Sequence, residues 1–219
     1  MDLSYFIKIK EKLNEIYEWT VATFIRRLFK KPASILFLGI DNAGKTTLLN
    51  KLKNDTTSTF APTHHPMATE IEIGNLTVKV VDMGGHTAAR MAWKEYYQRC
   101  DGVVFVVDVN DSKRFGIVRE TFEMVRGLEI LNKTVKPPIA VFMNKIDLVG
   151  HNTQSAMNDP TFCDVLRRET GIYDEDDTYG QPVKVTYLSI KEESPTNLSG
   201  PLVSTFKWLE LMISRNNMK

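Results

Sequence analysis

The feature that most constrains how this chain folds is a glycine-rich octapeptide that separates an apolar run from a helical pattern. The run Ser34–Leu38 is followed by Gly39–Thr46, which reads Gly-Ile-Asp-Asn-Ala-Gly-Lys-Thr, and Thr46–Lys53 has helical periodicity. The octapeptide matches G-x-x-x-x-G-K-[ST], in which backbone N–H groups turn inward around phosphate oxygens at a helix N-terminus. The sequence therefore predicts a strand, a phosphate-binding loop and a helix in direct succession.

Two side chains of this loop have specific chemical roles. Lys45 can reach the β- and γ-phosphates of a nucleotide, and the Thr46 hydroxyl can bind Mg²⁺. The loop positions expected to bind the nucleotide are Asp41, Asn42, Ala43, Gly44, Lys45, Thr46 and Thr47.

The rest of the chain alternates strand and helix patterns. Gly102–Val107 and Ile139–Met143 are continuously apolar, which is typical of parallel strands covered on both faces, and Val183–Ser189 is one more such run. Glu70–Ile73 and Leu76–Val81 alternate around a Gly-Asn pair, which is typical of a hairpin. We therefore expect an α/β fold with a mostly parallel six-stranded sheet and helices on both faces. The expected helices lie at 46–53, 90–99, 112–131, 158–169 and 201–214.

Two acidic motifs follow predicted strands, as the phosphate loop does. Asp82 ends one strand ahead of two glycines; its carboxylate can hold Mg²⁺ through the hydration shell, and Gly85 can donate its N–H to a γ-phosphate. Asp147 closes the motif Asn-Lys-Ile-Asp after another strand, and its carboxylate can accept from the N1–H and amine of guanine, donors that adenine lacks in that arrangement. A tripeptide after the last strand can meet the guanine oxygen through backbone N–H groups. The positions expected near the base are Asn144, Lys145, Asp147, Ser189 and Ile190.

Composition argues against two classes of protein, those that bind nucleic acid through a large net charge and those built on disulfide bonds. The chain has 219 residues with 28 Lys and Arg against 27 Asp and Glu, so it is an ordinary globular chain whose bulk charge gives no reason to expect nucleic acid as a partner. Cys100 and Cys163 are its two cysteines, which favours a reducing compartment over a disulfide framework. Residues 150–180 are polar and include four consecutive acids at 174–177, and we interpret them as a solvated insertion loop.

Residues 1–31 predict an amphipathic helix that Pro32 ends. Apolar side chains recur at three- and four-residue spacing over residues 3–29, but charged residues interrupt them too often for a membrane-spanning helix. No signal-peptide pattern is visible, and Asp2 is not the glycine that myristoylation requires. Two interpretations stay open: the helix packs permanently on the domain at 32–219, or it is released to lie in a membrane interface.

In this order the motifs resemble those of small GTPases, and Asp-Asn-Ala-Gly-Lys-Thr-Thr-Leu-Leu at 41–49 resembles the Arf/Sar branch. Asp82-Met83-Gly84-Gly85-His86 is similar to the Sar type, which has His where Arf proteins have Gln. Pro62-Thr63-His64-His65-Pro66 is likewise similar to the Sar switch I segment. The resemblance covers about residues 19–213. It implies a P-loop small G-protein fold and a switch that hydrolyses GTP to GDP and starts the COPII coat on the endoplasmic reticulum.

The resemblance also implies roles for individual residues. Thr63 would bind Mg²⁺ together with Thr46 and Asp82, Gly85 would contact the γ-phosphate, and His86 would position the attacking water. Lys45 would stabilise charge on the phosphates. No residue is identified as an arginine finger in cis, so hydrolysis is expected to be slow without a GTPase-activating protein (GAP).

The implied partners are GTP or GDP, Mg²⁺, the inner COPII coat acting as GAP, a membrane-bound exchange factor, and the anionic membrane of the endoplasmic reticulum through residues 1–31. The implied location is cytoplasmic and peripheral on that membrane, with the Golgi apparatus as a second site. The alternatives are a protein similar to signal-recognition-particle receptor β, an Arf-like GTPase with another membrane role, a GTP-binding scaffold that does not hydrolyse usefully, and an ATP-using kinase.

Overall fold

The structure is a computed structural model that describes residues 33–53, 68–73, 76–81, 87–128, 135–175, 180–194, 197 and 199–217. The helix predicted over 1–31 lies outside these residues, and so does the switch segment at 62–66. Within the described ranges, none of the helices combines the length and the apolar character needed to cross a bilayer.

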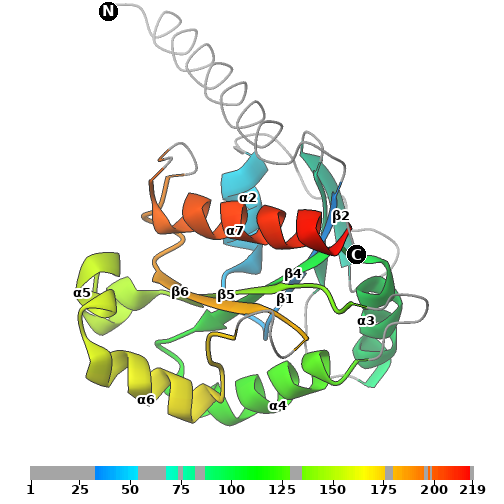
Figure 1. Cartoon of the computed structure of the whole chain (residues 1–219). Coiled ribbons are helices and arrows are strands. Elements are labelled where there is room, and N and C mark those ends of the chain that lie inside the picture. The colour runs from blue at the N-terminus through cyan, green and yellow to red at the C-terminus, as the bar shows by residue number, and fades with distance from the viewer. Residues whose placement is uncertain are drawn as a thin grey trace, which may run out of the picture.

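Six strands form one sheet in the order β2-β3-β1-β4-β5-β6 (Figure 1). Neighbouring strands run parallel except for β2 and β3, which pair antiparallel with Ala68 opposite Val81. The mostly parallel six-stranded sheet expected from the sequence is therefore confirmed. The strands are β1 (Ala33–Leu38), β2 (Ala68–Ile73), β3 (Leu76–Val81), β4 (Gly102–Asp108), β5 (Ile139–Asn144) and β6 (Val183–Leu188).

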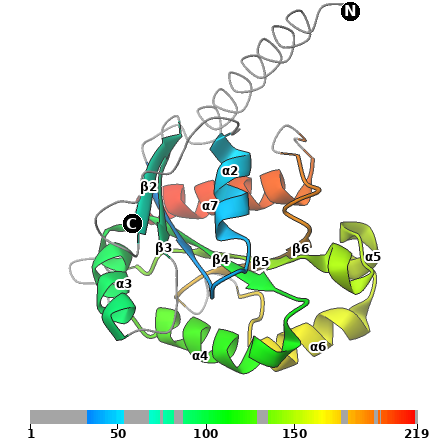
Figure 2. The ribbon, with the colours of Figure 1, turned by 180° about the vertical axis from the view of Figure 1, so that it is seen from behind.

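Helices cover both faces of the sheet. α2 (Lys45–Lys53) and α7 (Pro201–Asn216) lie on one face, while α3 (Thr87–Arg99), α4 (Phe115–Arg126) and α6 (Pro160–Thr170) lie on the other (Figures 1 and 2). The short elements are α5 (Thr153–Met157) and the 3₁₀ turns η1 (Ser112–Arg114) and η2 (Ile146–Val149).

The core is divided in two by the sheet because successive side chains of a strand point to opposite faces. Leu36 and Leu38 of β1 pack toward α3, α4 and α6, whereas Ile35 and Phe37 pack toward α2 and α7. Every residue of β4 and β5 is buried. This double burial explains why these strands are continuous apolar runs in the sequence.

The stretch 150–180 differs from the solvated loop expected for it. It contains α5 and α6, and the Asp159 side chain caps α6 by accepting the Phe162 N–H at 2.9 Å. Glu175 then exchanges backbone hydrogen bonds with Val183 of β6, and its carboxylate receives two hydrogen bonds from Arg126 at 2.6 and 2.7 Å. The acidic side chains at 174 and 175 therefore make tertiary contacts, although their position in a run of four acids predicts exposure to solvent.

Candidate functional site

The phosphate loop between β1 and α2 has an unusual backbone. Gly39, Asn42 and Gly44 have φ angles of +138°, +61° and +110°. A Cβ on Gly39 would lie 2.3 Å from the Val106 carbonyl oxygen, and a Cβ on Gly44 would lie 2.4 Å from the Asn144 Nδ2. Both glycines of the motif therefore permit a close approach as well as a left-handed backbone.

Lys45 holds its ammonium group inside this loop. The side chain is only 5% exposed, and Nζ donates to the carbonyl oxygens of Gly39 at 2.8 Å and Ile40 at 2.7 Å. The first turn of α2 contains no acidic residue, so the partial positive charge of the helix N-terminus is not neutralised by its own side chains. The ammonium and the helix end together make this loop an anion site.

Asn144 connects the phosphate loop to two other strand ends. Its side chain is buried at 3% exposure; Nδ2 donates to the Ala43 carbonyl oxygen at 2.8 Å, and Oδ1 accepts the Ile190 N–H at 2.9 Å. The loop after β1, the end of β5 and the turn after β6 therefore share one polar side chain. The N–H of Ile190, a residue that the sequence places near the base, donates to Asn144 in this structure.

Two further residues of the base motif lie just beyond Asn144. Lys145 has a left-handed backbone with φ of +68°, and its Nζ donates to Asp108 Oδ2 at 2.6 Å. Asp147 lies half-buried in the first turn of η2, and no described residue donates a hydrogen bond to its carboxylate. The Asp147 carboxylate is therefore available to an external donor, whereas Lys145 is oriented by Asp108.

The turn after β6 is held by hydrogen bonds within itself and by a hydrogen bond from α2. The Ser189 carbonyl oxygen accepts the N–H groups of Glu192 at 2.9 Å and Glu193 at 3.0 Å. Lys51 of α2 donates its Nζ to the Glu193 carbonyl oxygen, and burial lowers the pKa of Lys51. The turn that carries Ser189 is thereby fixed to the helix that begins at the phosphate loop.

Arg114 is a site residue that sequence reasoning missed. Its guanidinium pairs with Asp41 of the phosphate loop at 2.7 Å and with Asp111 at 2.6 Å. The hydrogen bond that Arg114 donates to the Asp111 carboxylate, together with the nearby Asp41 charge, raises the pKa of Arg114. In the sequence, the local indication of this cluster is that Asp111 and Arg114 stand three residues apart just after the apolar strand β4, which ends at Asp108.

The structure thus brings three predicted motifs to one edge of the sheet. Asp41 to Thr47 form the loop and the first turn of α2, where Thr46 and Thr47 are exposed, and Asn144 joins this loop to Ile190. Metal sites made of three or more His, Cys, Asp or Glu side chains do not occur among the described residues. The other predicted site residues lie outside the described part of the chain: Thr63, Asp82, Gly85 and His86.

The sheet order, the helices on both faces and the phosphate loop define a small GTPase fold of the P-loop class. The sequence profile of the ADP-ribosylation factor family matches residues 21–175, and the chain belongs to this family. The family predicted from the motifs is confirmed.

Similar proteins place the chain near one branch of that family. The small COPII coat GTPase SAR1 of Encephalitozoon cuniculi is 51% identical over 216 residues, which cover 98% of this chain and 96% of that protein. SAR1 of Giardia intestinalis is 44% identical over 121 residues, or 55% of this chain and 62% of that protein. The crystal structure of the E. cuniculi protein in complex with GDP has a TM-score of 0.83 and covers 98% of this chain and 95% of that chain.

Proposed function

We propose that this protein is a Sar-type GTPase that binds GTP, hydrolyses it to GDP, and recruits the COPII coat for vesicle budding from the endoplasmic reticulum. The observation that carries the nucleotide-binding part is the Asn144 side chain, which joins the phosphate loop to both base motifs. The coat-related part rests on the similarity to the COPII coat GTPase of E. cuniculi.

The phosphate loop supplies the charge that a triphosphate needs. Lys45 would stabilise negative charge on the β- and γ-phosphates, and the N–H groups of residues 41–47 would surround the phosphate oxygens. Phosphoryl transfer to water depends on such positioning and charge stabilisation more than on covalent chemistry. The burial of Lys45 favours this role because its ammonium is positioned before the nucleotide arrives.

Guanine selectivity would come from the second half of the site. The Asp147 carboxylate would accept from two guanine donors, and the Asp108–Lys145 ion pair would hold the neighbouring Lys145 side chain in place. Backbone N–H groups of the turn at Ser189 would contact the guanine oxygen. ATP would leave the Asp147 carboxylate unpaired, which disfavours it.

The residues present fit Mg²⁺ as the accompanying ion. Mg²⁺ prefers oxygen ligands, and the exposed Thr46 side chain lies in the first turn of α2 beside Lys45. Thr46, Thr63 and Asp82 would hold the ion, which when bound neutralises charge on the β- and γ-phosphate oxygens.

Hydrolysis would be controlled by residues near the γ-phosphate together with a partner. His86 would orient the water, and the Gly85 N–H and Thr63 would contact the phosphate end only while the γ-phosphate is present. Among the described residues, Arg114 is the arginine whose guanidinium contacts the phosphate loop. It already pairs with Asp41 and Asp111, so we do not assign it the role of an arginine finger. The inner COPII coat would therefore supply the arginine finger as GAP, and a membrane-bound exchange factor would restore GTP.

The division at residue 31 would separate membrane attachment from the switch. Residues 1–31 would form the amphipathic helix that meets the anionic membrane of the endoplasmic reticulum, and residues 32–219 would form the GTPase domain. The protein would then be cytoplasmic and peripheral on that membrane, and also on the Golgi apparatus.

One experiment tests the central claim. The full chain is purified without added nucleotide, denatured, and the released nucleotide is identified by anion-exchange chromatography. GDP or GTP in near-stoichiometric amount is expected. Release of ATP or ADP would contradict the assignment, and turnover of GTP with added inner coat then tests hydrolysis.

A further inference from the structure

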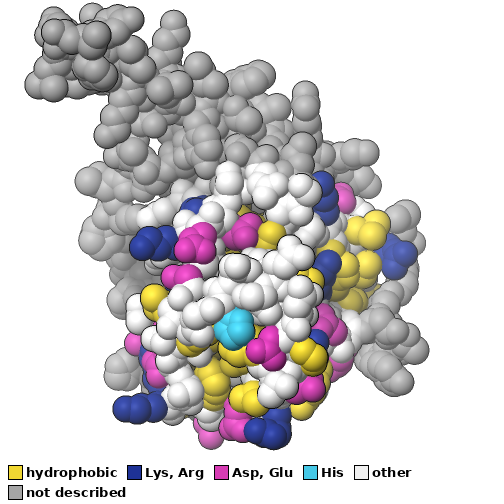
Figure 3. All heavy atoms as spheres, turned by 90° about the vertical axis from the view of Figure 1, so that its left-hand side faces the viewer, with side chains coloured by type: hydrophobic (Ala, Val, Ile, Leu, Met, Phe, Trp, Pro, Cys, Tyr) yellow, Lys and Arg dark blue, Asp and Glu magenta, His cyan; other side chains and the backbone are white. Residues whose placement is uncertain are grey.

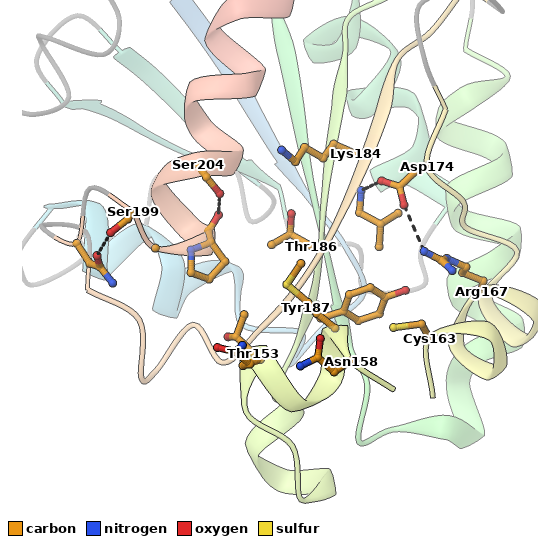
Figure 4. A pocket seen from close by; sticks show the side chains of 16 residues that line it. Thr153, Asn158, Cys163, Arg167, Asp174, Lys184, Thr186, Tyr187, Ser199 and Ser204 are labelled. Carbon is orange, nitrogen blue, oxygen red and sulfur yellow. Dashed lines mark hydrogen bonds and ion pairs between the residues drawn. The ribbon is translucent and has the colours of Figure 1, made fainter. Parts of the chain in front are cut away.

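A cavity of about 730 Å³ flanks strand β6, which lies at one edge of the sheet, opposite the β2 edge. Its walls come from β6, α5, α6 and the start of α7, and none of the predicted nucleotide-site residues lines it (Figure 4). The size lies within the range of about 300–1,000 Å³ that is usual for ligand pockets. The side of the molecule that bears α5 shows apolar, charged and other polar side chains close together (Figure 3).

The edge of β6 is covered over only part of its length. Val183 exchanges both backbone hydrogen bonds with Glu175 at 2.8 Å, and the Val185 N–H donates to Asp174 Oδ1 at 2.8 Å. Alternate residues of a parallel strand direct their backbone groups to the same side, so the Val185 carbonyl and the Tyr187 N–H also face away from β5. Neither has a hydrogen-bond partner among the described residues. Unpaired edge groups of this kind are a template for another strand.

A buried side chain in the same cavity also lacks a partner. Tyr187 is only 5% exposed, and its hydroxyl lies beside the Cys163 thiol of α6 but has no nitrogen or oxygen partner among the described residues. Burial raises the pKa of Tyr187 well above its usual range, so the group remains a proton donor. An unpaired buried donor is costly, and a ligand oxygen that reached it through a small shift of the covering side chains would remove that cost.

The two walls of the cavity differ in charge. Thr186 hydrogen-bonds Thr205 of α7 at 2.7 Å, which places Lys184 and Thr186 on the α7 side of the sheet. The side chain of Lys184 makes no ion pair with any described residue. An extended ligand would therefore find on this wall a cation that no described residue neutralises.

The opposite wall is largely apolar. Val185 and Tyr187 belong to the core cluster that includes Cys163 and Leu166 of α6, and Met157 adds an exposed apolar side chain. The Arg167 charge on this side is already paired with Asp174 at 3.6 Å and with Asp164 at 3.3 Å. This wall suits a small apolar or hydroxyl-bearing side chain, whose oxygen would meet the Tyr187 hydroxyl once the side chains that cover it shift.

We propose that this cavity binds a short extended segment of a partner protein, which adds to β6 as a strand and places acidic side chains toward Lys184 and apolar or hydroxyl-bearing side chains toward Tyr187. The Val185 carbonyl and the Tyr187 N–H make the backbone hydrogen bonds, and the period of two along a strand accounts for the alternation of side chains. The proposal does not depend on the nucleotide or on the coat.

Fluorescence anisotropy on the full chain tests the charge preference. The probe is acetyl-Glu-Val-Glu-Thr-Glu-Val-amide with a fluorophore, and its comparison is the same peptide with Lys in place of Glu. The acidic peptide is expected to bind saturably and about tenfold more tightly. Lys184→Glu should reverse the preference, whereas Lys113→Glu, an exposed site on η1 with the same charge change, should not. Equal binding of both peptides, or equal effects of both substitutions, would overturn the proposal.

Strand addition has its own readout. With ¹⁵N-labelled protein, the acidic peptide should slow solvent exchange of the Tyr187 amide. Two further peptides carry N-methyl groups on their odd-numbered or on their even-numbered backbone nitrogens, and only the one whose methylated nitrogens face β6 should bind more weakly. Tyr187→Phe should weaken binding several-fold while the protein stays folded. An unprotected Tyr187 amide would contradict strand addition. Self-association of the protein alone that Lys184→Glu abolishes would assign the edge to a second copy and likewise overturn the proposal.

Discussion

The carboxamide of Asn144 lies between Ala43 and Ile190, donating to the carbonyl oxygen of Ala43 at 2.8 Å and accepting the N–H of Ile190 at 2.9 Å. These two partners are 147 positions apart in the chain and belong to the two ends of the proposed nucleotide site. One buried side chain therefore sets the distance between the phosphate loop and the turn that is proposed to meet the base. Several expectations depend on this contact and on the residues beside it.

Asn144→Ala should lower the free energy of unfolding by about 1–3 kcal/mol, because it leaves a buried carbonyl and a buried N–H without partners. The same change should speed nucleotide release, since the two ends of the site are no longer joined. Urea unfolding and the dissociation rate of a fluorescent GDP analogue measure the two effects. Asn110→Ala, at an exposed position on the same side of the sheet, is the control. Release rates that match in the two variants would refute the joining role.

Gly39→Ala and Gly116→Ala should have opposite effects on stability. A Cβ at Gly39 would lie 2.3 Å from a backbone oxygen of β4, whereas a Cβ at Gly116 of α4 meets nothing within 4 Å. The first change should destabilise the protein and impair nucleotide binding. The second should stabilise it by up to about 1 kcal/mol, as Ala does over Gly in helices. Thermal unfolding of both variants checks this, and a stable Gly39→Ala protein would show that the loop adjusts freely.

Asp147→Asn should shift the base preference from guanine toward xanthine nucleotides. The carboxylate would accept hydrogen bonds from guanine donors, whereas an amide at this position would present a donor of its own that matches the extra xanthine oxygen. Competition binding with GTP, XTP and ATP measures the preference. An unchanged ranking with GTP first would remove Asp147 from base recognition.

His86→Gly should leave GTP binding nearly intact and lower GAP-stimulated hydrolysis. The expectation rests on the position of His86 directly after the Asp-Met-Gly-Gly motif, where its side chain would orient the attacking water. Single-turnover hydrolysis with and without GAP tests it. Wild-type rates in both conditions would exclude His86 from the mechanism.

Removal of residues 1–30 should leave nucleotide binding unchanged and abolish binding to anionic vesicles. Burying a Phe- or Leu-sized side chain contributes roughly 1.5–3 kcal/mol, so three or four such residues suffice for micromolar-range association after ordering costs. Flotation with a GTP analogue and with GDP compares the full and the truncated chains. Equal flotation of the two chains, or of the two nucleotide forms, would indicate a permanently packed helix.

The strands were predictable because burial on both faces makes them apolar throughout, as β4 and β5 show, and the phosphate loop was predictable because its backbone requires glycine at Gly39 and Gly44. The contacts that complete the site were not predictable in the same way. The pairs Arg114–Asp41 and Lys145–Asp108 join segments that only the sheet order brings together. Local pattern also gave the wrong interpretation of Glu175, since an acid within an acidic run indicates solvent until its partner Arg126 is known.

The backbone contact between Glu175 and Val183 has a consequence for how the protein behaves in a crowded solution. A sheet that ends in a fully open strand invites unlimited pairing between molecules, which is a route to aggregation. Here the protein's own chain occupies the first part of that strand, and the Asp174 carboxylate blocks the next N–H. The remaining opening at β6 is only a few residues long, so it offers too little length for two sheets to join through this edge.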